Sequence, residues 1–206
     1  MCATPALRPD LKRSLTSMLE ALIDACGRAA DHMGATPTIE TVSEGALIIS
    51  PHITALTVSE GELPWGRFLL HHDPRDRFNI QLDVFSRGYT GGIHAHGTWG
   101  AFWLLRGQLK VWDYHEVNGP PTLARFGLAG PGGFACFCPP ISDWHKVGVP
   151  EGGDQTVSVH IYGRGYDMDT GLALGEDGRP RTYTRGAWGD RAQVLPALRP
   201  REGGRA

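Results

Sequence analysis

Residues 88–107 have the sequence Gly-Tyr-Thr-Gly-Gly-Ile-His-Ala-His-Gly-Thr-Trp-Gly-Ala-Phe-Trp-Leu-Leu-Arg-Gly, and this stretch decides the fold. A glycine-rich turn leads into His94 and His96, which are two residues apart. Successive side chains on a β-strand point to opposite faces, so these two imidazoles share one face. Imidazole suits iron, zinc, copper and nickel, so the pair indicates a transition-metal site without choosing the metal. A histidine pair on a protein surface is the alternative.

Alternating hydrophobic residues around this stretch predict short β-strands. In residues 78–84 apolar side chains alternate with polar ones, as in a half-buried strand. Residues 101–114 are predicted to form a hairpin, and 134–138 and 156–162 two further strands. Short strands at this spacing, without intervening helices, favour a β-sandwich or barrel.

The two ends of the chain have other patterns. Residues 10–35 carry the apolar stripe of an amphipathic helix that packs on the outside of the main domain. Residues 36–63 are interrupted by prolines, and Leu47-Ile48-Ile49 within them is typical of a short strand. The chain after Gly175 is rich in Gly, Arg and Pro, and we expect residues 196–206 to be disordered.

Length and composition set the class of protein. The chain has 206 residues, enough for a single domain (1–206) with its barrel core at 63–170. Its 41% hydrophobic and 20% charged residues are ordinary for a soluble globular protein, and a net charge of −2 gives no reason to expect nucleic acid or a membrane as partner. No secretory signal is visible, and four cysteines are too few for a disulfide framework, so a cytoplasmic location is expected.

Two further patterns join the histidine pair. In residues 156–162, three apolar residues fall on one face and Ser158, His160 and Tyr162 on the other; this polar row faces either solvent or, in a barrel, an internal site. His145 follows a Pro-Pro corner, and with His94 and His96 it would supply three neutral imidazoles. Three protein ligands leave coordination positions open, as a catalytic metal site requires.

These motifs resemble those of a known family. Gly88-x5-His94-x-His96, followed by Gly107, resembles the first cupin motif, and Pro140-Ile-Ser-Asp-Trp-His145 is similar to the second. The glutamate ligand usual near position 100 or 101 is missing, because Gly100 and Ala101 stand there. Three histidines without this carboxylate are characteristic of the thiol dioxygenases, the cysteine dioxygenases and 3-mercaptopropionate dioxygenases. The resemblance covers residues 63–170.

The resemblance implies a mainly β fold, a cupin double-stranded β-helix (jelly-roll barrel) with an N-terminal α-helical segment. It implies Fe(II) bound by His94, His96 and His145. It also implies a catalytic role for Tyr162, whose phenol would be held by His160 and Ser158.

Arg67 resembles the arginine that holds the substrate carboxylate in cysteine dioxygenases, with Tyr162 as a further substrate contact. This match requires a one-residue insertion before Phe78, and a solvated surface arginine is the alternative. Gly163-Arg164-Gly165 replaces a Ser-Pro-Pro segment of that family, so Arg164 is either a second carboxylate contact or a loop arginine. The family's cross-linking cysteine would fall at Ala101, which excludes a thioether to Tyr162.

The implied activity is the addition of O2 to the sulfur of a small carboxylate-bearing thiol, of the cysteine or 3-mercaptopropionate type, to give a sulfinate. The partners would be the thiol and O2, and the protein would be a monomer or a small homo-oligomer. Two alternatives remain open: a cupin that uses another metal for isomerase, hydrolase or lyase chemistry, and a non-catalytic cupin that binds a small ligand.

Several other residues invite a functional interpretation. Cys136 and Cys138 are expected in the core rather than on a metal. Trp99 and Trp144 are close to ligands in the sequence and are candidates to line the pocket. The remaining histidines have no partner at ligand spacing and are expected at the surface or in loops; they are His32, His52, His71, His72 and His115.

Overall fold

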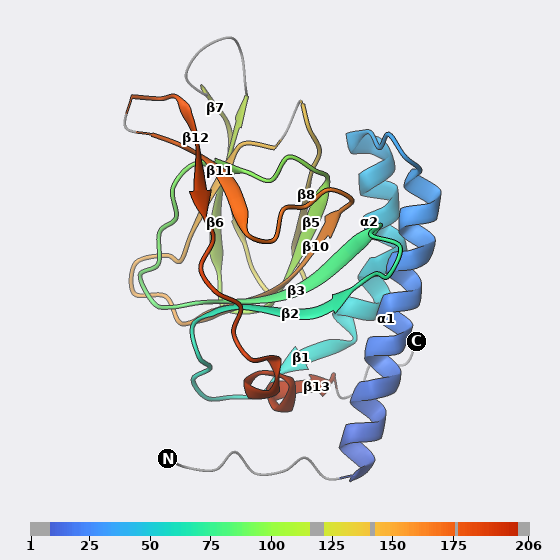
Figure 1. The fold of residues 1–206 in the computed structure, drawn as a ribbon. Helices are drawn as coiled ribbons and strands as arrows, with labels where there is room; N and C mark the ends of the chain where they lie inside the picture. Colours follow the sequence, from blue (N-terminus) through green and yellow to red (C-terminus); the bar gives the residue numbers. More distant parts are fainter. Residues whose placement is uncertain (1–8, 116–121, 141–142, 176, 202–206) are drawn as a thin grey trace.

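In a computed structural model of the chain, the described residues are 9–115, 122–140, 143–175 and 177–201. Two helices, α1 (Pro9–Met33) and α2 (Ile39–Thr54), lie side by side along a barrel of strands (Figure 1). The strands are β1 (Leu56–Val58), β2 (Gly66–His72), β3 (Phe78–Phe85), β4 (His94–Ala95), β5 (Gly100–Arg106), β6 (Leu109–His115), β7 (Thr122–Ala129), β8 (Phe134–Phe137), β9 (His145–Gly148), β10 (Thr156–Gly163), β11 (Thr170–Leu174), β12 (Pro180–Thr184) and β13 (Leu198–Pro200). None of the helices in these ranges is long and apolar enough to cross a membrane.

The barrel consists of two antiparallel sheets. One has the strand order β2-β3-β10-β5-β8 and the other β12-β11-β4-β9-β6-β7. From β3 to β11 the chain passes from one sheet to the other at every step except the β6–β7 hairpin. Such alternation between two sheets is the double-stranded β-helix. The predicted fold class, a mainly β cupin-type jelly-roll barrel with N-terminal helical structure, is confirmed.

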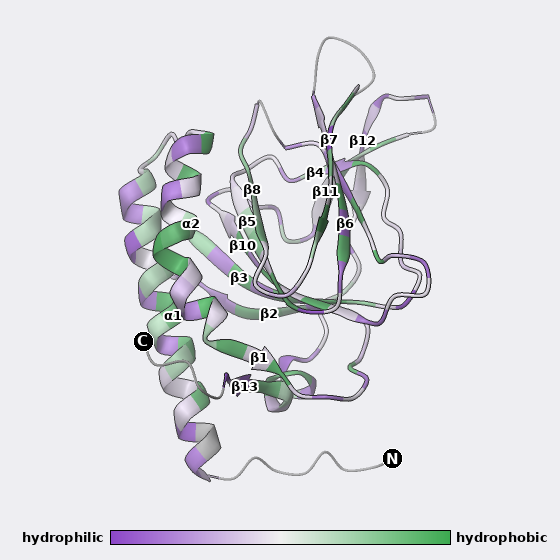
Figure 2. Ribbon diagram, turned by 180° about the vertical axis from the view of Figure 1, so that it is seen from behind, coloured by the Kyte–Doolittle hydropathy of each residue, from purple (hydrophilic) through white to green (hydrophobic). Residues whose placement is uncertain are grey.

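Strand β10 separates two cores. Val157, Val159 and Ile161 are fully buried against the cluster that includes Leu22 of α1 and Ile49 of α2. The helices therefore cover the outer face of the five-stranded sheet, as the view from behind shows (Figure 2). The opposite face of β10 points into the barrel, and all eight residues of the strand are buried. The polar row of β10 consequently faces an internal space rather than solvent.

Residues 47–49 were predicted as a strand, and this is wrong because they lie inside α2. Thr38 caps the helix: its hydroxyl accepts from the Thr41 amide at 3.4 Å, while the Thr41 hydroxyl accepts from the Thr38 amide at 2.9 Å. The buried residues Val42, Ala46, Ile49 and Ile53 recur at helical spacing. Pro51 falls in the last turn, where it does not prevent the helix from forming.

The predicted 101–114 hairpin is also wrong. Strands β5 and β6 are consecutive in sequence but belong to different sheets. Gly107 turns the chain between them with φ of +79°, and a Cβ there would lie 2.5 Å from the Thr156 hydroxyl oxygen. A glycine is therefore required at this corner, which turns the chain into the opposite sheet instead of back along its own.

The C-terminal part is more ordered than expected. Beyond position 170, β11 and β12 complete the six-stranded sheet. Residues 196–206 were expected to be disordered, yet Leu198–Pro200 form β13, which pairs with β1, and Leu198 is fully buried. Residues 202–206 lie outside the described residues, as does the predicted loop at 118–121.

Candidate metal centre and its cavity

The barrel brings the three predicted histidines together. Strands β4 and β9 are neighbours, and His94 is the direct cross-strand partner of His145. His96 follows β4 by one residue. One ring nitrogen from each histidine lies within 4.8 Å of the others, and the Nε2 atoms of His96 and His145 are 3.3 Å apart. His94 and His145, which are 51 positions apart in the sequence, thus converge because β4 and β9 are adjacent in the six-stranded sheet.

Backbone carbonyls set the orientation of two of the rings. The Nδ1 of His94 donates to the Gly92 carbonyl at 3.0 Å, and the Nδ1 of His145 donates to the Asp143 carbonyl at 2.9 Å. With Nδ1 as the donor, each ring presents the Nε2 lone pair to the shared site. The Asp143 carboxylate accepts from the amides of His96 and Gly97, at 2.9 and 2.7 Å, and so fixes the backbone that carries His96.

Burial keeps these imidazoles neutral. It lowers the pKa of His94 to about 4, and it lowers the pKa values of His96 and His145 well below their usual range, with a further contribution from the neighbouring imidazoles. Two nitrogen ligands that are each about 2.0–2.1 Å from one ion lie about 3.0–3.4 Å apart. The 3.3 Å between His96 and His145 falls in this range. The residues therefore fit a divalent transition metal.

The missing carboxylate ligand has a structural cause. A Cβ on Gly100 would lie 2.2 Å from the ring of Phe137, so a side chain at position 100 would require Phe137 to move. That ring stacks on His96 at 5.1 Å and lies 4.9 Å from His145, measured between ring centroids. Ala101 is buried in the opposite core, so it can supply neither a ligand nor a link to Tyr162. Among the His, Cys, Asp and Glu side chains of the described residues, only the three histidines form a group that could hold a metal.

Ser158, His160 and Tyr162 form a hydrogen-bonded row beside this group. The Ser158 hydroxyl is 2.8 Å from His160 Nε2, and the Tyr162 hydroxyl is 3.1 Å from His160 Nδ1. The Tyr162 ring lies 4.5 Å from the ring of His96. Burial raises the pKa of Tyr162 well above its usual value, with a smaller effect of the neighbouring Tyr166, so its phenol keeps its proton. The row therefore presents an O–H donor next to the metal group.

A cavity of about 330 Å³ lies between the two sheets and opens onto the histidines. Arg67 lines it. Its Nη2 donates to the carbonyls of Met168 and Gly186, both at 2.8 Å, and its guanidinium lies 4.1 Å over the ring of Trp188. Its buried Nη1 has no acceptor among the described residues. Arg67 is therefore a fixed cation with one donor left for a ligand.

The register of β2 and β3 shifts by one residue between Arg67 and Phe78. Arg67 pairs with Asp83 and Leu69 with Gln81, but the register shifts before His71, which leaves Leu70 unpaired in a β-bulge. A bulge absorbs a one-residue insertion without turning Arg67 to the other face of the sheet. The bulge is compatible with the alignment that gave Arg67 its predicted role.

Sequence reasoning missed several residues of the cavity. Asn79 and Gln81 were taken for the exposed side of β3, yet both are buried, and Gln81 and Asp83 line the cavity. Arg185 lies beyond the predicted core; its Nε donates to the Thr170 carbonyl at 2.6 Å, and its guanidinium lies 4.6 Å over the Tyr166 ring. No spacing in the sequence points to Arg185, because only the β11–β12 pairing carries it to the cavity.

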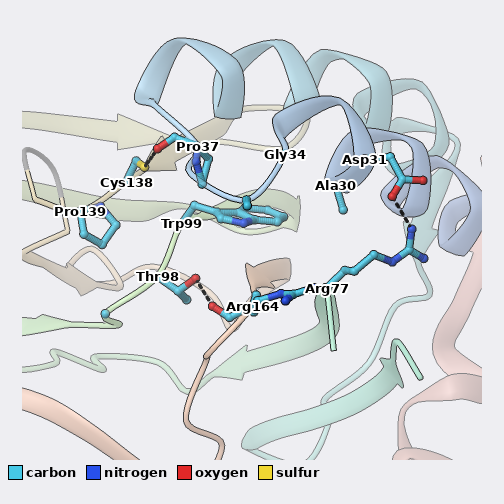
Figure 3. Close-up of a pocket in the computed structure, with 12 residues that line it drawn as sticks. Ala30, Asp31, Gly34, Pro37, Arg77, Thr98, Trp99, Cys138, Pro139 and Arg164 are labelled. Atoms are coloured by element: carbon cyan, nitrogen blue, oxygen red, sulfur yellow. Dashed lines mark hydrogen bonds and ion pairs between the residues drawn. The ribbon is translucent and has the colours of Figure 1, made fainter. Parts of the chain in front are cut away.

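Other candidates lie elsewhere. Trp99 and Arg164 line a separate pocket of about 460 Å³ between the C-terminal end of α1 and the barrel, together with Cys138 (Figure 3). The Cys138 thiol donates to the Pro37 carbonyl, and Cys136 packs at the edge of the helix-covered core. Trp144 is buried and does not line the histidine cavity. Within the described residues, none of the other histidines belongs to a possible metal group.

No family model matches the chain. Solved structures similar to it include a cupin 2 conserved barrel domain protein from Rhodopseudomonas palustris, at 18% identity over 60% of this chain and 79% of that one, with a TM-score of 0.42. A protein of unknown function with a cupin-like fold from Ralstonia eutropha matches at 18% identity over 58% of this chain and 64% of its own, with a TM-score of 0.40. A cupin-2 domain protein from Rhodospirillum rubrum matches at 12% identity over 68% of this chain and 77% of its own, with a TM-score of 0.40.

Proposed function

We propose that this protein is a non-haem Fe(II) thiol dioxygenase. It adds both atoms of O2 to the sulfur of a small thiol that carries a carboxylate, and it releases a sulfinate. The observation that carries the proposal is a group of three neutral histidines without a carboxylate, which lines one cavity together with His160, Tyr162 and Arg67. Ser158 holds His160 from behind, and Nη1 of Arg67 has no acceptor among the described residues.

Neutral ligands suit a thiol substrate. His94, His96 and His145 would hold the ion without reducing its charge of +2. A cation of this charge favours the thiolate over the thiol, whose ordinary pKa is about 8.5. Bound Fe(II) would supply the redox chemistry that joins O2 to sulfur.

The other residues position the substrate. The open Nη1 of Arg67 would donate to the carboxylate and hold the sulfur at the histidines. Tyr162 would donate its O–H to the substrate or to oxygen, while His160 and Ser158 fix its orientation. The reaction is balanced as thiol plus O2 giving sulfinate plus one proton: two S–O bonds form, the O–O bond breaks, and sulfur loses the four electrons that O2 gains.

Oxygen consumption across a panel of thiols tests this function. Protein purified anaerobically and loaded with Fe(II) is expected to consume one O2 per thiol with cysteine or 3-mercaptopropionate, and more slowly with cysteamine, which lacks the carboxylate; mercaptosuccinate adds a second carboxylate to the comparison. His145→Ala should abolish both iron binding and O2 uptake, whereas His115→Ala, outside the cavity, should alter neither. Metal analysis that finds another ion, together with no O2 uptake for any thiol, would exclude the proposal.

A further inference from the structure

Asp83 and Arg67 are direct cross-strand partners on the cavity side of β2 and β3. Each has a buried polar atom without a hydrogen-bond partner among the described residues: Oδ1 of Asp83, an acceptor, and Nη1 of Arg67, a donor. Buried polar atoms are nearly always satisfied, so two unsatisfied atoms on neighbouring residues that both line the cavity require an explanation. A bound ligand that carries both a donor and an acceptor would provide one.

The two residues do not satisfy each other. The ion pairs of the described residues include none between Asp83 and Arg67; the other carboxylate oxygen of Asp83 lies 3.6 Å from His160 Nε2. Arg67 is held away by its bonds to Gly186 and Met168 and by its contact with Trp188. The opposite charges therefore stand next to each other with one hydrogen-bonding atom of each left for a ligand.

We propose that Asp83 binds the ammonium group of an amino-acid substrate while Arg67 binds its carboxylate, so that the enzyme selects thiols with an α-amino group. This inference rests on the function proposed above. An α-amino acid carries both groups on one carbon, which matches an acceptor and a donor on adjacent residues. Asp83 would also repel a second carboxylate at that point, and this disfavours dicarboxylic thiols.

The electrostatics of the cavity agree with this assignment. Burial raises the pKa of the Asp83 carboxyl, and electrostatic interactions with His160, Arg67 and Arg185 oppose the rise. An ammonium group placed on Oδ1 would add a further positive charge and favour the ionised carboxylate. A thiol without an amino group would leave this buried oxygen unpaired, which is unfavourable.

Anaerobic calorimetric binding to the Fe(II)-loaded protein separates the two contacts. L-cysteine carries both charged groups, 3-mercaptopropionate lacks the ammonium and cysteamine lacks the carboxylate. We expect Asp83→Asn to weaken the binding of cysteine and cysteamine roughly 10- to 100-fold. The binding of 3-mercaptopropionate should be unchanged or tighter. Arg67→Gln, the matched control, should weaken the binding of cysteine and 3-mercaptopropionate and leave the binding of cysteamine unchanged. Asp83→Glu keeps the charge and should retain part of the preference for amino thiols.

The inference is overturned if Asp83→Asn weakens 3-mercaptopropionate as much as cysteine, if it changes the binding of neither, or if cysteine does not bind the wild-type protein. Because binding is measured without O2, its outcome is separate from that of turnover. Selective binding without O2 consumption would contradict the dioxygenase and leave the role of Asp83 intact. If cysteine is oxidised equally fast by the wild type and by Asp83→Asn, the dioxygenase function stands and the role of Asp83 is contradicted.

Discussion

Tyr162 places its hydroxyl 3.1 Å from His160 Nδ1 and its ring beside that of His96. Tyr162→Phe removes the O–H donor and keeps the ring. We expect kcat for thiol oxidation to fall on the order of 10²-fold, the usual size of a lost proton donor, with iron content unchanged. Rates from O2 consumption and iron per chain from elemental analysis are measured on the same samples.

Tyr114→Phe is the matched control, because Tyr114 lies on β6 and does not line the cavity. Its rate and iron content should equal those of the wild type. A parallel loss of iron and activity in Tyr162→Phe would assign the phenol a structural role instead.

At the scale of single residues, period-two patterns predicted which side chains share a face. These patterns placed His94 and His96 on one common face, and Ser158, His160 and Tyr162 on one face of their strand. They did not distinguish a polar face in solvent from one in a cavity, which is why Asp83 was taken for an exposed residue. Only closure of the barrel decides between the two.

Strand β13 connects the end of the chain to the helical side of the barrel. Leu198 pairs with Val58 of β1 and is fully buried in the core that the helices cover. Leu198→Ala should lower the free energy of unfolding by about 2–4 kcal/mol, as expected for a cavity in a packed core. Urea denaturation monitored by circular dichroism measures this change.

Leu128→Ala provides the comparison at an exposed site, because Leu128 on β7 is 56% exposed. Its effect should remain below about 0.5 kcal/mol. If the two substitutions had the same small effect, the segment 198–200 would not be packed in solution.

At the scale of elements, the sequence predicted whether a segment is a helix or a strand better than it predicted how the strands are connected. The long amphipathic helix α1 and the alternating strands followed from their periodicity. The helix α2 was missed because Leu47-Ile48-Ile49 has strong strand propensity, and the deciding stripe extends over 42–53. The β5–β6 connection was misassigned because a glycine turn looks the same whether the chain folds back or crosses to another sheet.

At the scale of the whole molecule, the barrel buries several imidazoles together at one site. Burial lowers the pKa values of His94, His96, His145 and His160 below the usual 6.5, that of His94 to about 4. A sequence does not contain this property, since each histidine alone would titrate normally in an unfolded chain. The shifts appear only when distant strands enclose the rings.

A pH dependence of stability follows for the metal-free protein. Between pH 6.5 and about 4 the unfolded chain binds protons at these imidazoles and the folded protein does not. The free energy of unfolding should therefore be largest above pH 6.5 and fall as the pH falls through this window, by at most about 1.4 kcal/mol per pH unit for each imidazole. Denaturation in the presence of a chelator, from pH 7.5 to 4.5, measures the slope.

Because carboxyl groups also titrate toward the acid end, the slope must be compared with that of a variant. The double variant His96→Asn and His145→Asn should have a shallower slope, whereas His115→Asn, at an exposed site outside the cavity, should keep that of the wild type. Added Fe(II) should raise the stability of the wild type by binding only the folded state, and it should not affect the double variant. Equal slopes in all three proteins would mean that the imidazoles are accessible to protons in the fold, and that the enclosed neutral site does not exist in solution.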